Sequence, residues 1–339
     1  MQLDRTEIVI RARGAAELCD LSLQVLKRHV WAIAASSGLL GWPLLLLDSW
    51  AIAWMLGEEA RLALDHLDTP ESLMRWRHAT HLIALYVMQF PLVSLPTSVY
   101  LGHQIFFQPL PLRSLLGRLL PIAGRCLLIL GIIRLGLVGL VMQWWVDRQV
   151  AFDVLVEFWL IFALAGVAVV QRIFRPFAPE ILGLELCRLR SRRAGEISYY
   201  TRSSSLHRYL FSEQISRFAG ISFYLVLLTA SLLAAQLFVI GASTGYWQWN
   251  WWLDYIGLPL SLWCVGLFAA VFRFLSYLDS RIRLEGWEVE LRLKAEALRL
   301  APAPQVARQR GHSGLSSDTA AELDVLVPEL VADGRRGAP

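Results

Sequence analysis

The sequence predicts an all-α membrane protein with six transmembrane helices and additional interfacial and cytoplasmic amphipathic helices. Of its 339 residues, 56% are hydrophobic and only 18% are charged, which is too apolar for an ordinary soluble domain. The apolar residues also gather in stretches long enough to cross a ~30 Å hydrocarbon core at about 1.5 Å per helical residue. These stretches are residues 30–56, 79–107, 119–145, 152–174, 218–241 and 254–278.

Prolines and flanking residues refine the first two stretches. The second is longer than a straight span needs and contains Pro91 and Pro96, so we expect one kinked helix. Pro43 is expected to bend the first helix in the same way. The first stretch starts late and lacks a small-residue cleavage site, so we predict that it is a membrane span and not a signal peptide.

The distribution of basic residues predicts the orientation. Of the 32 lysines and arginines, 24 fall on the side that would hold both termini, four fall on the opposite side, and four lie within the apolar stretches. The positive-inside rule therefore predicts a bacterial inner-membrane protein with both termini in the cytoplasm. The net charge of +4 then reflects topology, and no nucleic-acid partner is expected despite the interleaved arginines and tyrosines of "CRLRSRRAGEISYYTR".

The chain divides into four parts at changes of composition. Residues 1–29 form a cytoplasmic N-terminal segment, in which Leu18, Leu21, Val25 and Leu26 share one face of a predicted interfacial helix. The predicted membrane domain, cytoplasmic amphipathic helix and disordered tail are residues 30–278, 279–300 and 301–339.

Two cytoplasmic segments are predicted to form a lipid or partner surface. The connection after the fourth stretch contains "RIFRPFAPEILGLELCRLRSRR", whose leucines and isoleucine favour a surface-lying helix among arginines. Anionic headgroups attract nearby basic side chains by about 1 kcal/mol each, although orientation alone explains these charges equally well. The predicted surface residues are Arg188, Arg190, Arg192, Arg193, Trp287 and Leu291.

The connection between the fifth and sixth stretches is rich in aromatic residues. It reads "GASTGYWQWNWWLDYIG" and predicts an external aromatic belt that holds the helix ends at headgroup level. A stacking platform for sugars or lipid headgroups is the alternative. The belt residues are Trp247, Trp249, Trp251 and Trp252.

Arg134 lies in the middle of the third apolar stretch, roughly 22 Å along a helix from its cytoplasmic start. An arginine facing lipid at that depth would cost several kcal/mol, so its side chain must face protein or water. We expect an ion pair with Asp48 first and with Glu157 second. Neighbouring polar residues of the second span, Gln89 with Ser94 and Thr97, could complete this network.

The predicted network has two interpretations. It could fix the register of the helices, which Gly124, Gly131 and Gly139 support by offering a close-packing face, or it could form part of a substrate pathway, proton relay or anion site. Arg125 and Arg273 are expected to lie near the cytoplasmic boundary and to reach it by snorkelling.

No catalytic residue, cofactor or metal site is predicted. The four cysteines have neither metal-ligand spacing nor an external pair that would form a disulfide. One external connection contains possible metal ligands, but their spacing matches no strong motif. These residues are Asp65, His66, Asp68, His78 and His81.

Three motifs resemble one known family. The segments "AELCDLSLQVLKRHVWAI", "RPFAPEILGLE" and "YLDSRIRLEGWEVELRLKAEA" resemble elements of bacterial six-span proteins related to the membrane domain of glycerophosphoryl diester phosphodiesterases. The resemblance covers residues 14–300 and implies the fold. It implies no catalytic residue, because the phosphodiesterase activity of those two-part enzymes belongs to a separate soluble domain.

The sequence leaves two functions open. The first is a non-enzymatic inner-membrane scaffold or accessory subunit of an envelope-associated complex, which would contact membrane lipids and cytoplasmic or membrane protein partners. The alternative is a transporter or lipid-handling protein with a polar pathway around Arg134 and Asp48.

Overall fold

The structure is a computed structural model that describes residues 13–57, 71–105, 111–146, 154–189, 197–208 and 211–286. All of these residues belong to the first of the chain's two units, Met1–Glu288. Several predicted features lie outside the described residues. They are the possible ligands Asp65, His66 and Asp68, the surface residues Arg190, Arg192, Arg193, Trp287 and Leu291, and the C-terminal tail.

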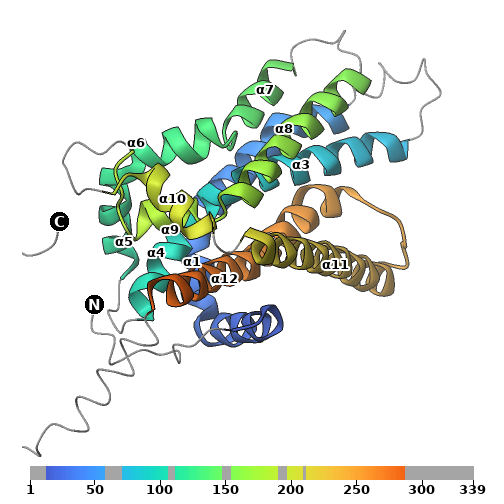
Figure 1. Cartoon of the computed structure of the whole chain (residues 1–339). Helices are drawn as coiled ribbons and strands as arrows, with labels where there is room; N and C mark the ends of the chain where they lie inside the picture. Colours follow the sequence, from blue (N-terminus) through green and yellow to red (C-terminus); the bar gives the residue numbers. More distant parts are fainter. Residues whose placement is uncertain are drawn as a thin grey trace, which may run out of the picture. The chain divides into compact units, whose positions relative to one another are not determined.

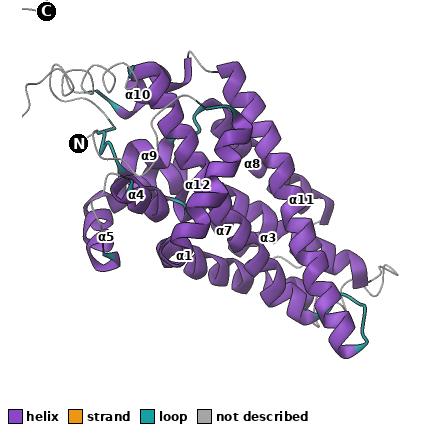
Figure 2. Ribbon diagram, turned by 90° about the horizontal axis from the view of Figure 1, so that it is seen from below, coloured by secondary structure: helices purple, strands orange, loops and turns teal. Residues whose placement is uncertain are grey.

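The predicted fold class is confirmed. Within the described ranges the chain forms helices and loops without any strand (Figure 2), and it includes six helical segments long and apolar enough to cross a membrane. The elements, of which η3 and η4 are π-helices, are α1 (Ala15–Ile52), η1 (Ala53–Leu56), α3 (Glu71–Val93), α4 (Leu95–Gln104), α5 (Leu112–Leu119), η2 (Leu120–Ile122), α6 (Ala123–Cys126), η3 (Leu127–Ile133), α7 (Val138–Val146), α8 (Val154–Phe174), α9 (Ala178–Gly183), α10 (Tyr199–Arg208), α11 (Phe211–Thr244), η4 (Leu253–Gly257) and α12 (Leu258–Glu285).

Helices α3 and α4 form the centre of the bundle. Helix α3 packs against α1 and α8, and α4 packs against α1, α9 and α12 (Figure 1). In the most apolar part of Met74–Gln104, 83% of the residues are buried, whereas in that of α11 none is, as expected of a helix with one face on lipid. The sequence predicts one kinked helix here, whereas the structure has two helices, α3 and α4, separated only at Ser94 between the two prolines.

Helix α1 bends at a different place from the one predicted. Its non-helical residue is His29, with φ −119° and ψ 25°, whereas Pro43 lies inside regular helix. The turns before His29 pack Leu18 and Leu21 into a core cluster that also contains residues of α4 and α12. The N-terminal amphipathic helix is therefore anchored on protein, and the bend at His29 lets it leave the direction of the span.

The third apolar stretch is not the continuous helix that the sequence predicts. Helix η3 ends at Ile133, and α7 begins only at Val138. Between them Leu135 adopts a left-handed conformation with φ 63°, which L-residues other than glycine rarely take. Gly136 permits the break, because a side chain there would begin 2.6 Å from the Leu130 carbonyl oxygen. Arg134 thus sits at an interruption of a membrane helix.

The connection after α8 also differs from its prediction. Helix α9 was expected to lie on the membrane surface, but every residue from Ala178 to Gly183 is buried. Gly183 allows this close packing, since an added side chain there would meet Val99 and Leu95 of α4. The chain therefore folds back into the bundle at α9 before α10 returns to the end where Arg13 meets Asp279. We call this the proximal end, and the end with η1 and η4 the distal end.

Candidate functional site

Glu180 of α9 is the buried anchor of a polar cluster near the middle of the bundle. Its carboxylate is fully buried, and its Oε1 accepts a hydrogen bond from Ser98 Oγ at 2.9 Å. The same oxygen pairs with Arg273 Nε of α12 at 2.9 Å. Arg273 was expected to reach the membrane surface by snorkelling, and that prediction is wrong because Glu180 holds its guanidinium inside.

Arg134 enters the same region from the helix break. Its Nη2 donates hydrogen bonds to the Arg175 carbonyl oxygen and, at 3.5 Å, to the Tyr199 hydroxyl oxygen. Arg134 is 5% exposed, and its charge interacts with those of Glu180 and Arg273. Within the described residues it forms no ion pair with a carboxylate, and its Nη1 lacks a hydrogen-bond partner.

Arg172, in the last turn of α8, completes the group. Its guanidinium carbon lies 5.8 Å from the centre of the Phe90 ring, and that of Arg273 lies 5.2 Å from the same ring. The charges of Arg172, Arg134 and Arg273 repel one another. Phe90 lies near the middle of the segment Met74–Gln104, so this gathering of positive charge is deep in the bundle.

We name Arg134, Arg172, Arg273 and Glu180 the arginine cluster. Three guanidinium groups against one carboxylate give these four residues a formal surplus of two positive charges, because arginine stays protonated in proteins. Four buried polar atoms in or beside the cluster have no hydrogen-bond partner in the described structure, and such atoms in native proteins call for an explanation. They are Arg134 Nη1, Arg172 Nη2, Glu180 Oε2 and Tyr86 Oη.

The unsatisfied donors and the surplus charge suit an anion with several acceptor oxygens. Guanidinium groups bind phosphate and carboxylate oxygens through charge-assisted hydrogen bonds. A discontinuous membrane helix beside a buried charged group is also the arrangement in which many transporters place their binding sites. The arginine cluster therefore has the chemistry of an anion-binding site.

Helices α9 and α10 pack together (Figure 1), and they supply Glu180 and the Tyr199 hydroxyl to this region. Arg202 of α10 makes hydrogen bonds of 2.6 and 2.9 Å to the two oxygens of Glu185, and it also pairs with Glu285 at the end of α12. The hydrogen bonds to Glu185 raise the pKa of Arg202 above its ordinary value. These ion pairs hold α10, and with it the Tyr199 hydroxyl, against the site.

The predicted network around Arg134 is only partly present. Gln89 Nε2 donates to Asp48 Oδ1 at 2.6 Å, so the structure brings these two residues together. Arg134 joins neither Asp48 nor Glu157, because the helix break directs it toward Arg175 and Tyr199. The other expected members also bond elsewhere: Ser94 Oγ donates to the Phe90 carbonyl oxygen, and Thr97 lies 3.4 Å from Ser36 Oγ.

Glu157 belongs to a separate polar cluster nearer the distal end. It pairs with Arg77, and it lies 3.2 Å from both His81 Nε2 and Gln143 Nε2. Arg77 stacks on the Trp54 ring at 4.8 Å. We name Arg77, His81, Gln143 and Glu157 the glutamate cluster, in which one carboxylate faces one arginine.

The residues of the predicted aromatic belt divide into exposed and anchored ones. Trp247 and Trp251 are 57% and 66% exposed, as a headgroup belt requires. Trp249 is tied down instead, because its Nε1 donates to Asp254 Oδ1 at 2.5 Å and its carbonyl oxygen accepts from Arg75. Trp252, beside the start of η4, is half-buried.

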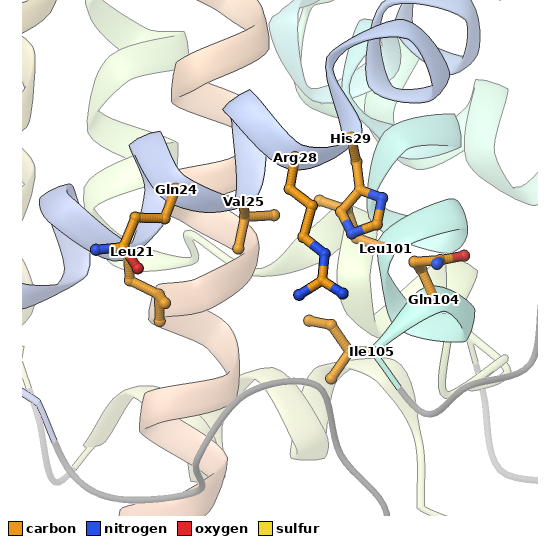
Figure 3. Close-up of a pocket in the computed structure, with 8 residues that line it drawn as sticks. All are labelled: Leu21, Gln24, Val25, Arg28, His29, Leu101, Gln104 and Ile105. Atoms are coloured by element: carbon orange, nitrogen blue, oxygen red, sulfur yellow. The ribbon is translucent and has the colours of Figure 1, made fainter.

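A small cavity of about 100 Å³ lies where the N-terminal part of α1 meets the end of α4 (Figure 3). In this view Arg28 and His29 extend from α1 beside Leu101 and Ile105. Arg188, the described member of the predicted basic surface, is exposed elsewhere at the proximal end. The cavity lining is Leu21, Gln24, Val25, Arg28, His29, Leu101, Gln104 and Ile105.

Sequence reasoning missed most of the arginine cluster. Arg172 and Glu180 were assigned to a surface connection because arginines surround them in the sequence, and Arg273 was assigned to the membrane boundary. The available signal was Glu180 itself, since an isolated carboxylate inside the apolar run "FAPEILGL" needs a buried cation if that run is buried.

Comparison with known proteins adds no relative. No family, no curated protein and no solved structure matches the chain.

Proposed function

We propose that this membrane protein binds a phosphate-bearing anion in the arginine cluster and acts as a lipid-handling or transport protein. The observation that carries the proposal is the surplus of positive charge in a buried site: Arg273 pairs with Glu180, Arg134 lies close enough for its charge to interact with that carboxylate, and Arg172 lies near both arginines. Buried charge without a partner is costly. An anion would supply the missing countercharge and the missing hydrogen-bond acceptors.

The location of the cluster supports entry from the proximal end. We place the protein in a bacterial inner membrane with both termini, and therefore the proximal end, in the cytoplasm. Arg134 is almost fully covered by Arg175 and Tyr199, so the described state is closed. Movement of α10 would admit a ligand, and the Arg202 ion pairs oppose that movement.

Thermal unfolding of the full chain in detergent tests the proposal. The probes are inorganic phosphate, a short-chain phosphatidic acid and a zwitterionic short-chain phosphatidylcholine. A ligand at 100 times its Kd stabilises the folded state by about 2.7 kcal/mol, which is a readily measured shift. We expect phosphatidic acid to stabilise the protein more than phosphatidylcholine. If inorganic phosphate also raises the unfolding temperature, the site binds a small anion. If only phosphatidic acid raises it, the site binds a lipid headgroup.

Two variants assign any shift to the site. Arg172→Gln removes a guanidinium that has no ion pair in the described structure, so it should leave folding intact and reduce the shift at least fivefold. Arg113→Gln removes an equally charged but exposed side chain outside the predicted lipid surface and should leave the shift unchanged. No shift with any anion, or equal shifts in both variants, would overturn the proposal.

A scaffold or accessory-subunit role, the first function predicted from the sequence, has less support from geometry. Its expected surfaces, Trp287 and Leu291 with the arginines after Arg188, lie outside the described residues. It remains a prediction that partner capture in native membranes can test.

A further inference from the structure

Asp48 and Gln89 form an isolated polar pair between α1 and α3. Both side chains are fully buried, and Gln89 Nε2 donates to Asp48 Oδ1 at 2.6 Å. The pair belongs to neither the arginine cluster nor the glutamate cluster, whose carboxylates have arginine partners. Asp48 is therefore a buried carboxyl group that neither cluster explains.

No cation balances Asp48 in the described part of the chain. A charged nitrogen within 4.0 Å would form an ion pair, and none is present there. On the neighbouring helices α3 and α12, Arg77 pairs with Glu157 and Arg273 pairs with Glu180. An ionised carboxylate with only an amide partner would be very costly in such surroundings.

The elements packed against α1 supply no other charged group that pairs with Asp48. Helix α7 and η1 contain no titratable residue. The remaining titratable or charged groups on packed elements are Glu71, Arg75, Arg77, His78, His81 and Tyr86 of α3, Tyr100 and His103 of α4, and Cys264, Arg273, Tyr277, Asp279, Arg281, Arg283 and Glu285 of α12.

The hydrogen bonds of the pair point to a missing proton. Asp48 Oδ2 and Gln89 Oε1 are both buried acceptors without a partner. A primary amide and a carboxylic acid can pair reciprocally, the amide N–H donating to one carboxyl oxygen and the carboxyl O–H donating to the amide oxygen. The first of these bonds is present, and a proton on Oδ2 would supply the donor for the second.

We propose that Asp48 is a proton-binding site of the membrane domain and that Gln89 holds the protonated form. The bound proton closes the reciprocal pair and removes the uncompensated charge. Its loss would break one hydrogen bond between α1 and α3 and leave a bare carboxylate in the bundle. Proton occupancy of Asp48 is thereby linked to the packing of these two helices, independently of any ligand in the arginine cluster.

Infrared spectroscopy of the purified full chain tests this site without requiring reagent access. A protonated carboxyl group shows a C=O stretch at higher frequency than the carboxylate bands. We expect such a band at neutral pH, its loss in Asp48→Asn, and its retention in Asp20→Asn, which alters an exposed aspartate of the same helix. A band that is absent, or that survives in Asp48→Asn, would overturn the proposal.

Stability gives a second, separate readout. Asparagine has the hydrogen-bonding pattern of protonated aspartate, so Asp48→Asn should unfold within about 2 °C of wild type. Asp48→Leu, which has neither donor nor acceptor and leaves both polar atoms of Gln89 unpaired, should unfold at clearly lower temperature. If Asp48→Asn is as damaging as Asp48→Leu, the native group is ionised and the proposal fails.

Discussion

The glutamate cluster and the arginine cluster solve the same physical problem in different ways. Both place charge inside a membrane bundle, and both stack an arginine on an aromatic ring. In the glutamate cluster the Glu157 carboxylate meets Arg77, His81 and Gln143, so its charge and its acceptor oxygens are matched. In the arginine cluster positive charge exceeds negative charge. Buried donors without a partner occur in both clusters, at Arg134 Nη1 and Arg172 Nη2 here and at Arg77 Nε in the glutamate cluster, so the difference lies in the charge balance.

This difference separates a structural role from a binding role. A balanced buried pair fixes the positions of its helices, and removal of either member leaves the other uncompensated. An unbalanced group of like charges destabilises the protein on its own, so its presence indicates a missing partner. The comparison can be tested by changing one residue in each cluster.

The largest effect is expected in the balanced cluster. Arg77→Leu leaves Glu157 buried without its cation and should lower the free energy of unfolding by about 3–5 kcal/mol. Arg172→Leu in the arginine cluster should leave stability without ligand unchanged or raise it, because it relieves repulsion. Chemical unfolding in mixed micelles measures both. The double variant Arg77→Leu with Glu157→Leu should recover much of the loss, and failure to do so would argue that the stacking of Arg77 on Trp54 dominates.

A second prediction concerns the helix break that directs Arg134 into the unbalanced cluster. In Gly136→Ala the new Cβ would lie 2.6 Å from the Leu130 carbonyl oxygen and 3.4 Å from that of Met88. Forcing this backbone apart should cost about 1–3 kcal/mol in the same unfolding assay. Gly124→Ala is the matched control, because nothing lies within 4 Å of the added atom. Equal stability of the two variants would mean that the break does not depend on close approach at Gly136.

The two clusters also differ in how far the sequence could predict them. The six spans follow from the length of the apolar stretches, and burial of Arg134 follows from the cost of facing lipid. Its partners could not be predicted, because they depend on a left-handed Leu135 and on backbone contact at Gly136, for which a single sequence gives no reliable signal. Glu180 was misplaced for a related reason: its flanking arginines indicate a surface, whereas its burial depends on Arg273, 93 residues later.

A smaller effect is expected from the ion pairs that hold α10 against the arginine cluster. The Arg202 side chain is 16% exposed and binds Glu185 and Glu285, which is the last residue of α12 and is 23% exposed, so solvent and salt weaken these ion pairs. Arg202→Gln should therefore lower stability by only about 1 kcal/mol. It should also increase the rate at which phosphatidic acid associates, because α10 moves away from the arginine cluster more often. Stopped-flow binding to Arg202→Gln and to Arg113→Gln checks this, and equal association rates would show that α10 is not the barrier.

The smallest predicted effect is on the alkylation rate of Cys187, which lies in the connection between α9 and α10. Burial raises the pKa of the Cys187 thiol, and the neighbouring Glu185 carboxylate raises it further. Glu185→Gln removes that negative charge, so the pKa falls, more thiolate is present near pH 7.5, and alkylation should be about two- to fivefold faster.

The variant Glu285→Gln separates this charge effect from movement of α10 away from the arginine cluster. It breaks the ion pairs of Glu285 with Arg202 and Arg281 but keeps the charge of Glu185 next to the thiol. Peptide-resolved mass spectrometry of alkylated Cys187 across a pH series distinguishes the two causes. An ionisation effect shifts the pH profile and disappears above the thiol pKa, whereas an opening effect persists at every pH and occurs in both variants. Only in the second case should phosphatidic acid protect Cys187, because ligand in the arginine cluster would then favour the closed position of α10.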